Sequence, residues 1–342
     1  MKIGLVGYQG SGKSSLFQWL TGVQPDPAMA HTSQSAMAPV PDPRVAELCH
    51  IYNPKKITLA SLEIVDTPGL SRTHEGNATR LALIREAGCL VHVVAAFDGS
   101  NPINDIRNFQ EDMVLTDLEI MTGRVERLRE SVKKPRPNRE EQQTELAALE
   151  PLLEQLENGQ GLAGVEFTDE QDKATRSFGL LTRKRRIALV NVADDDRELD
   201  RFGQAPGIDI PVIGVPIGLE VELSRMSEQE QLEFRHEMGV GSFDRDGLIR
   251  QLMAFSGQML FFTAGEKEVR TWMIPQQTRA VDAAGAIHSD LARGFIRAEI
   301  MSCDDLIRLK SEREVKAQNL VRQEHKEYII QDGDILNIRF SV

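Results

Sequence analysis

The first half of the chain alternates short apolar runs with longer amphipathic segments. The apolar runs consist mainly of Val, Ile, Leu and Ala, as is typical of strands that are covered on both faces of a parallel sheet. The amphipathic segments between them predict helices in right-handed βαβ crossovers. The pattern therefore predicts an α/β fold with a mainly parallel sheet. Its strands are expected at residues 3–6, 59–65, 90–95, 187–190 and 212–215.

A helical repeat interrupts this alternation. Apolar residues recur there at spacings of three and four positions, which is the heptad pattern of a coiled coil. Two prolines, Pro135 and Pro137, divide the repeat into two runs. The runs predict an antiparallel coiled-coil hairpin inserted into the sheet domain, with a shorter helix after it at about 169–181. The apolar positions of the hairpin are Leu118, Met121, Val125, Leu128, Val132, Leu146, Leu149, Leu153 and Leu156.

The chain ends in a smaller α+β unit. Its pattern predicts strands at 268–274 and 295–301 and a helix at 281–287. The segments 328–330 and 335–340 flank a Gln-Asp-Gly-Asp sequence, which has the composition of a hairpin turn. We therefore expect three domains. They are a sheet domain of residues 1–112 and 183–258, a helical insertion of residues 113–182 and a C-terminal domain of residues 259–342.

Composition is that of an ordinary soluble protein. Of the 342 residues, 41% are hydrophobic and 27% are charged, and no apolar run approaches the ~20 residues that a membrane helix needs. A strand is predicted almost at the N-terminus, which leaves no room for a signal peptide. Cys49, Cys89 and Cys303 are isolated from one another, so we expect a reducing, cytoplasmic environment. The net charge of −12 argues against a general nucleic-acid coat.

A glycine loop that matches the phosphate-binding P-loop follows the first predicted strand. Residues 7–14 read GYQGSGKS and precede an amphipathic segment, which is the context that the motif G-x-x-x-x-G-K-[ST] requires. We expect backbone N–H groups here to surround the phosphates of a nucleotide. Lys13 is the expected catalytic contact to the β- and γ-phosphates, and the Ser14 hydroxyl is the expected Mg²⁺ ligand. The predicted nucleotide contacts are Gly10, Ser11, Gly12, Lys13, Ser14 and Ser15.

A second motif ends the next predicted strand. Residues 66–69 read Asp-Thr-Pro-Gly, a D-x-x-G sequence. After a P-loop, Asp66 is expected to support Mg²⁺ through water, and the Gly69 N–H is expected to sense the γ-phosphate. A hydroxyl should also approach the metal from the segment before this strand. Thr32 is taken as that ligand, although the sequence does not exclude Ser33 or Ser35.

A third motif ends the strand that is expected at 187–190. Residues 191–194 read Asn-Val-Ala-Asp, at the place where guanine-nucleotide switches carry N-K-x-D. By that comparison Asn191 braces the loop and contacts the base, and Asp194 accepts hydrogen bonds from guanine. Val192 replaces the lysine that would stack along the base. The alternative is a simple Asx turn at the end of a strand.

The residue after Gly69 is Leu70, where many related GTPases have the glutamine that orients the attacking water. Leucine has no hydrogen-bonding group, so hydrolysis should be slow unless another group holds the water. His92, within the apolar run 90–94, is a candidate catalytic residue, and the alternative is an ordinary core histidine. His74, in the loop after Leu70, is a further candidate.

Together these stretches resemble the YchF subfamily of Obg-like P-loop NTPases. Residues 41–44 look like the family's P-D-P-R, 66–70 like its D-x-x-G-L and 191–194 like its N-V-x-E. Three C-terminal stretches, 262–270, 294–299 and 328–334, resemble its TGS domain, a β-grasp module. The resemblance covers the whole chain in order. It implies a ribosome-associated ATPase or GTPase that often favours ATP, and His92 matches the family's H-V-V segment.

Two positions depart from the family pattern. Gly10 stands where the family has an asparagine that helps to hold a monovalent cation, which leaves potassium dependence open. Asp194 stands where the family has glutamate, which weakens the preference for ATP that the resemblance implies. The first switch and the loop after Leu70 also differ. The chain therefore looks like a divergent member.

Basic residues are concentrated at the tip of the predicted hairpin, and a second cluster, 183–186, lies near its base. A basic arm on an acidic protein suits contact with a phosphate backbone. A solvated helix surface is the alternative. The tip residues are Arg124, Arg127, Arg129, Lys133, Lys134, Arg136 and Arg139.

We therefore expect a Mg²⁺-dependent enzyme that hydrolyses ATP, slightly favoured, or GTP and acts as a switch with the ribosome or RNA. It should be a monomer with no membrane contact and no DNA sequence readout. Two alternatives stay open: a nucleotide sensor with negligible hydrolysis, and an RNA-binding adaptor with a vestigial nucleotide site.

Overall fold

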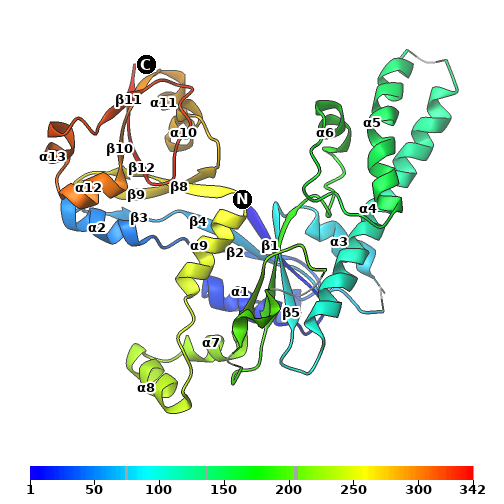
Figure 1. Cartoon of the computed structure of the whole chain (residues 1–342), viewed down its shortest axis with the longest axis horizontal. Helices are drawn as coiled ribbons and strands as arrows, with labels where there is room; N and C mark the ends of the chain where they lie inside the picture. Colours follow the sequence, from blue (N-terminus) through cyan, green and yellow to red (C-terminus); the bar gives the residue numbers. More distant parts are fainter. Residues whose placement is uncertain (74–75, 136, 197, 204–206, 342) are drawn as a thin grey trace. The chain divides into compact units, whose positions relative to one another are not determined.

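The computed structural model describes residues 1–73, 76–135, 137–196, 198–203 and 207–341. The chain forms two compact units, of which the first comprises Met1–Ala36 and Glu63–Phe243 and the second Met37–Leu62 and Asp244–Val342. Two six-stranded sheets organise the chain (Figure 1). None of the described helices is long and apolar enough to cross a bilayer.

The first sheet has the strand order β2-β4-β1-β5-β6-β7. The pairs β1–β4, β1–β5, β5–β6 and β6–β7 are parallel, which confirms the predicted α/β class. Every residue of β5 is buried, and this explains its uninterrupted apolar sequence. The strands are β1 (Lys2–Val6), β2 (Gln34–Pro39), β4 (Ser61–Asp66), β5 (Cys89–Ala95), β6 (Arg185–Asn191) and β7 (Val212–Val215).

The main helices of the first unit bury their apolar residues against this sheet or against each other. Helix α1 (Lys13–Thr21) packs against α7 (Ile217–Leu223). Helices α3 (Asn77–Ile84) and α4 (Pro102–Val132) share a core cluster with β1 and β5. Because parallel strands end at the same edge, the loops after β1, β4 and β6 meet there. The remaining helices are η1 (Pro27–Met29), α5 (Arg139–Glu157), α6 (Asp169–Thr175), η2 (Leu199–Phe202) and α8 (Glu228–Met238).

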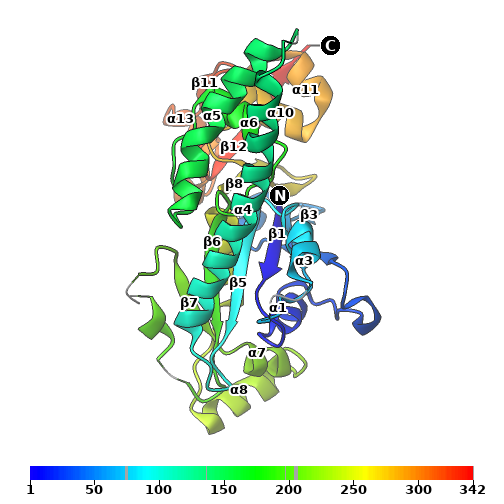
Figure 2. The same cartoon turned by 90° about the vertical axis from the view of Figure 1, so that its right-hand side faces the viewer.

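The helical hairpin is present, but its first helix starts earlier than the sequence pattern predicts. Helix α4 begins at Pro102, after the Asn101 side chain accepts hydrogen bonds from two helix N–H groups. It continues past residue 113 without a break, so the predicted domain boundary falls inside it. Helix α5 runs back beside α4 (Figure 2), and their apolar positions form one core cluster. Helix α6 is shorter than predicted and ends at Thr175.

A buried carboxylate fixes the base of the hairpin to the sheet. Asp117 of α4 is fully buried. It accepts hydrogen bonds from Arg85 Nη1 (3.1 Å), from the N–H groups of Leu181 (3.0 Å) and Thr182 (2.8 Å), and from Thr182 Oγ1 (2.9 Å). Arg85 follows α3 directly, and Thr182 lies shortly before β6. One side chain thus joins three segments that are distant in sequence.

The second unit has a β-grasp arrangement with the strand order β11-β10-β12-β8-β9-β3. Strand β12 is parallel to β8, whereas β8–β9 and β10–β12 are antiparallel. Helix α10 (Ala280–Ile287) shares the core of this sheet. The other elements are β3 (Ile57–Thr58), β8 (Gln258–Ala264), β9 (Val269–Pro275), β10 (Phe295–Ser302), β11 (Arg322–Glu324), β12 (Asp334–Phe340), α2 (Pro43–Tyr52), α9 (Arg245–Phe255), α11 (Ser289–Arg293), α12 (Cys303–Leu309) and α13 (Glu312–Ala317).

The predicted hairpin around residues 331–334 is wrong. Residues 328–330 form no strand, and Ile329 makes only an isolated bridge with Arg279. The Asp334 carboxylate accepts hydrogen bonds from the Gln331 N–H (2.9 Å) and from Tyr328 Oη (3.1 Å). These bonds fold the segment onto itself, so β12 pairs with β10 and β8 instead.

Candidate functional site

The P-loop joins β1 to α1 as predicted, and Gly12 shows why glycine is needed. Gly12 precedes α1 with φ 97°, a left-handed conformation that favours glycine. A Cβ atom there would lie 2.4 Å from Asn191 Nδ2. The Asn191 amide also donates to the Ser11 carbonyl (3.3 Å) and accepts from the Ile217 N–H (3.2 Å). Asn191 of the third motif therefore joins the P-loop to the start of α7.

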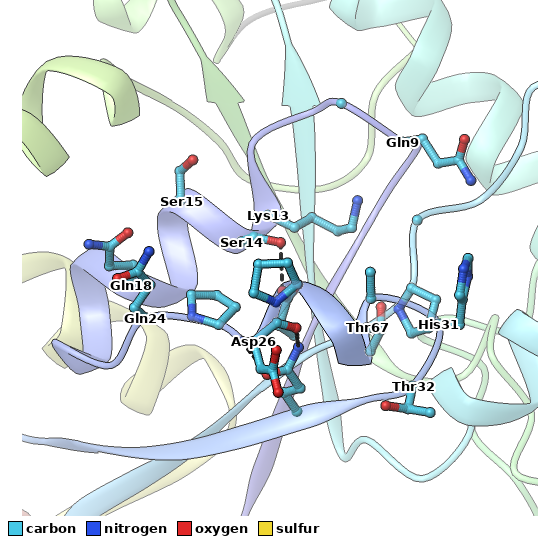
Figure 3. A pocket seen from close by; sticks show the side chains of 18 of the residues that line it. Gln9, Lys13, Ser14, Ser15, Gln18, Gln24, Asp26, His31, Thr32 and Thr67 are labelled. Atoms are coloured by element: carbon cyan, nitrogen blue, oxygen red, sulfur yellow. Dashed lines mark hydrogen bonds between the residues drawn. The ribbon is translucent and has the colours of Figure 1, made fainter.

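A pocket of about 500 Å³ opens beside this loop. Ser15 and Gln18 reach it from α1, whereas His31 and Thr32 reach it from the segment on the other side (Figure 3). The structure thus brings together most of the predicted phosphate and metal ligands. Those that line the pocket are Gly10, Lys13, Ser14, Ser15, Thr32, Asp66 and Gly69.

Lys13 is held within the P-loop. Its Nζ donates to the Tyr8 carbonyl at 2.8 Å, and only 6% of the residue is exposed. Burial lowers the pKa of Lys13 to about 8, although the nearby Asp66 carboxylate opposes this shift. The amine therefore remains mostly charged at neutral pH. The phosphates of a nucleotide would favour the charged form further.

Ser14 and Asp66, the predicted metal ligands, lie next to each other in the pocket wall. Ser14 Oγ donates to Asp66 Oδ2 at 2.7 Å (Figure 3). Burial raises the pKa of Asp66, and the Ser14 hydrogen bond and the Lys13 charge oppose that shift. Asp66 Oδ1 is buried and has no hydrogen-bond partner in the described part of the chain. A hydroxyl and a carboxylate with an unused oxygen fit Mg²⁺, which prefers oxygen ligands.

The loop after Asp66 is fastened to the P-loop. Leu70 donates its N–H to the Gly7 carbonyl, and its own carbonyl accepts from the Gln9 N–H, both at 3.0 Å. The Leu70 side chain is fully buried in the core, so it faces away from the pocket. A Cβ atom on Gly69 would lie 2.9 Å from Lys13 Nζ, which places the Gly69 backbone close to the expected phosphates.

His92 lies beneath the P-loop and does not line the pocket. The residue is 2% exposed and stacks on Phe109, with 4.1 Å between the ring centroids. Its Nε2 has no hydrogen-bond partner among the described residues. Burial lowers its pKa to about 3, and the charges of Arg186 and Lys13 add to the effect. His74, the other candidate, lies outside the described residues.

The other residues of the third motif have different environments. Val192 is buried with Val190 and Phe202 in a core cluster. Asp194 is exposed, and its Oδ1 accepts a hydrogen bond from the Leu219 N–H at 3.0 Å. Leu219 belongs to α7, which begins just after β7. The first turn of α7 therefore orients both polar side chains of the motif, a role that no sequence pattern indicated.

Of the three candidate switch hydroxyls, only Thr32 is among the described residues that line the pocket. Thr32 Oγ1 donates to the Met29 carbonyl at 3.0 Å. The pocket wall also contains Gln9, at a variable position of the P-loop motif, and His31 and Arg80, which the sequence motifs did not indicate. His31 and Arg80 belong to no spacing pattern, because the fold brings them to the pocket from a loop and a helix that are distant in sequence.

Comparison with known proteins identifies the family. Residues 2–121 match the family model described as "50S ribosome-binding GTPase", and residues 259–341 match the model YchF-GTPase_C, described as "Protein of unknown function (DUF933)". The "Ribosome-binding ATPase YchF" of Escherichia coli O157:H7 is 33% identical over 364 residues, covering 100% of this chain and 99% of the relative. The chain belongs to the YchF family. The resemblance inferred from the motifs is thus confirmed.

Other members of the YchF family agree over the full length. The protein of the same name from Bacillus subtilis is 32% identical over 365 residues, with 99% of each chain covered. "Obg-like ATPase 1" of Oryza sativa is 33% identical over 367 residues, covering 100% of this chain and 92% of the relative. The solved YchF GTPase of Schizosaccharomyces pombe matches with a TM-score of 0.84 at 26% identity, covering 99% of this chain and 97% of that one.

Proposed function

We propose that this chain binds a nucleoside triphosphate with Mg²⁺ at the P-loop, hydrolyses it slowly and acts as a switch associated with the ribosome. The observation that supports this most is the convergence of Lys13, Ser14, Asp66 and Gly69 on one pocket. The names of the relatives, which are ribosome-binding ATPases, support hydrolysis and the partner.

The proposed chemistry is mainly electrostatic. When a nucleotide binds, the Lys13 amine would give up its hydrogen bond to the Tyr8 carbonyl and contact the β- and γ-phosphates instead. The negative phosphates compensate its positive charge better than a carbonyl does. Ser14, Asp66 and Thr32 would hold Mg²⁺, with Asp66 acting through water. When bound, the ion neutralises charge on the phosphate oxygens. The Gly69 N–H would contact the γ-phosphate and couple its loss to a change in the following loop.

Slow hydrolysis follows from the position of Leu70. Its side chain is fully buried in the core. It therefore cannot hold the attacking water, and a polar side chain at this position would not reach the pocket. His92 lies beneath the loop, and we propose that it supports the P-loop rather than touching the water. This observation also favours a second candidate function, a nucleotide sensor whose hydrolysis is negligible.

A slight preference for ATP is proposed from the environment of Asp194. Its Oδ1 already accepts a hydrogen bond from the Leu219 N–H. Recognition of guanine by a carboxylate uses two oxygens at once, so this contact competes with it. An Asp194→Glu variant restores the residue of the family pattern, and its longer side chain should shift the selectivity further toward ATP. Calorimetric titration of ATP and GTP into both proteins tests the proposal, and identical selectivity in the two would contradict it.

Ribosome contact is proposed to involve more than the basic tip. Arg124 pairs with Glu145 at 2.7 Å, and Arg129 pairs with Glu150 at 2.9 Å. These ion pairs neutralise part of the charge that the sequence suggested, and Arg136 lies outside the described residues. Lys133 also pairs with Glu130, whereas Arg139 Nε donates to the Val132 carbonyl, which carries no charge. A phosphate contact by the tip would therefore depend mainly on Arg127, Lys134 and Arg139. We retain the three-domain division, with the insertion and the C-terminal domain as the proposed contact surfaces.

The experiment is single-turnover hydrolysis of ATP and GTP with and without ribosomes, using the wild type and Lys13→Ala. The proposal expects measurable cleavage in the wild type and a loss of about 10²-fold or more in the variant, because Lys13 neutralises the phosphates. Tight binding without cleavage under either condition would instead indicate a sensor. Ribosome association that is unchanged when nucleotide is removed would indicate an adaptor with a vestigial site.

A further inference from the structure

Two side chains with long cationic groups are found among the described residues that line the nucleotide pocket, Lys13 and Arg80. Lys13 belongs to the P-loop motif, whereas Arg80 belongs to no motif and comes from α3. We propose that Arg80 contacts the terminal phosphate of the bound nucleotide and stabilises the charge that develops there during hydrolysis. This inference rests on the proposed function and names a further catalytic residue for it.

The structure holds the Arg80 guanidinium near the start of α3. Long side chains on helices turn back toward the N-terminus, and a Cβ atom on Gly76 would lie 3.9 Å from Arg80 Nη2. Arg80 Nη1 donates a long hydrogen bond of 3.4 Å to Asn77 Oδ1, and a charged phosphate oxygen is a stronger acceptor than an amide oxygen. Arg80 is only partly buried as a residue and lines the pocket, which places it within reach of a ligand there.

Asn77 connects this group to the loop that is expected to contact the γ-phosphate. The residue is 6% exposed. Its Oδ1 accepts from the Ser71 N–H at 2.8 Å, and its Nδ2 donates to the Ser71 carbonyl at 2.9 Å. Ser71 lies two residues after Gly69. A change in the Gly69 backbone would therefore be transmitted to the support of Arg80 through the short path Ser71–Asn77.

The pocket needs such a group because the usual ones are absent or misplaced. Leu70 is in the core, and His92 lies beneath the loop. Hydrolysis breaks the bond between the γ-phosphorus and the β–γ bridging oxygen, and water supplies the new oxygen and the released proton. Arg80 takes part in no proton transfer. Its planar, permanently charged fork suits the phosphoryl oxygens, and arginines in this role contribute 10³–10⁵-fold in other NTPases.

The test compares wild type, Arg80→Ala, Arg80→Lys and the matched control Thr79→Ala, which changes the adjacent exposed residue of α3. Single-turnover hydrolysis is measured together with the Kd for a non-hydrolysable triphosphate. We expect R80A to be slower by at least about 10-fold, with Kd changed less than about 3-fold. R80K keeps the positive charge but lacks the planar guanidinium, so its hydrolysis rate should lie between those of R80A and the wild type. T79A should match the wild type in both measurements.

A second readout needs no turnover. Aluminium fluoride with Mg²⁺ and the nucleoside diphosphate mimics the transferring phosphoryl group, so it should lower the Kd of the diphosphate. The ratio of the Kd values without and with aluminium fluoride should be at least about 10-fold smaller in R80A than in the wild type. A structural role would instead weaken diphosphate, triphosphate and mimic equally and lower Tm. That result, or R80A behaving as the wild type, overturns the inference. If the wild type hydrolyses nothing, the proposed function fails, and the mimic still decides the role of Arg80.

Discussion

Replacing Asp117 should destabilise the first unit more than any exposed charge change. The carboxylate is fully buried and accepts four hydrogen bonds, from Arg85, Leu181 and Thr182. Alanine would leave the Arg85 guanidinium and two N–H groups without this acceptor. Removing one partner of a buried ion pair costs about 3–5 kcal/mol. Asparagine would keep one acceptor oxygen, so about 1–3 kcal/mol is expected for Asp117→Asn.

The measurement must report on the first unit alone. The chain has two tryptophans, and Trp19 lies in the first unit while Trp272 lies in the second. Urea unfolding followed by Trp19 fluorescence in a Trp272→Phe background therefore isolates the relevant transition. The Asp117 variants and their parent are compared in that background, with the free energy of unfolding taken from midpoint and slope.

Asp172→Ala is the matched control. Asp172 also pairs with an arginine, Arg183, at 2.6 Å, but both side chains are more than 40% exposed. Exposed pairs are worth about 0–1 kcal/mol, so this variant should remain close to the parent. If Asp117→Ala costs no more than Asp172→Ala, the reasoning from burial and hydrogen bonding is refuted.

Three further predictions concern the nucleotide site. Leu70→Gln should not accelerate single-turnover hydrolysis, because the side chain points into the core, and the buried amide should lower the free energy of unfolding by about 2 kcal/mol; a faster variant would contradict this. Gly12→Ala should weaken nucleotide binding at least about 10-fold in calorimetry, since its Cβ would collide with Asn191. Gly10→Ala shares the left-handed backbone (φ 79°) but has open space around its Cβ, so it should change binding less than Gly12→Ala. The pKa of His92 falls to about 3 in the folded chain against about 6.5 when unfolded. Its contribution to stability is therefore complete above pH 6.5 and should decline by about 2 kcal/mol at pH 5, as urea titrations at several pH values would show, whereas His92→Leu should lack this component.

Local sequence patterns identify some residues of the candidate site but not others. The P-loop could be located from residues 7–14 because phosphate binding uses consecutive backbone N–H groups, so a short sequence encodes the whole feature. Asp66 was found in the same way, since it ends an apolar strand. In contrast, Arg80 and His31 line the same pocket without any spacing signal. They reach it only because the fold brings helix α3 and the segment before β2 to the P-loop.

Sequence periodicity by itself determined the parallel sheet and the helical hairpin, because burial on both faces of a strand and along one face of a helix leaves a repeating apolar pattern. It did not determine where the side chains of Leu70 and His92 point, since the sequence pattern around an apolar or neutral residue is the same in a core and in a pocket. Packing decided this: Leu70 joined the core beneath the P-loop, and His92 stacked on Phe109. Tertiary structure also decided that Asp117 of α4 would bind the segments that follow α3 and precede β6, because its partners lie 32 to 65 residues away and leave no local pattern.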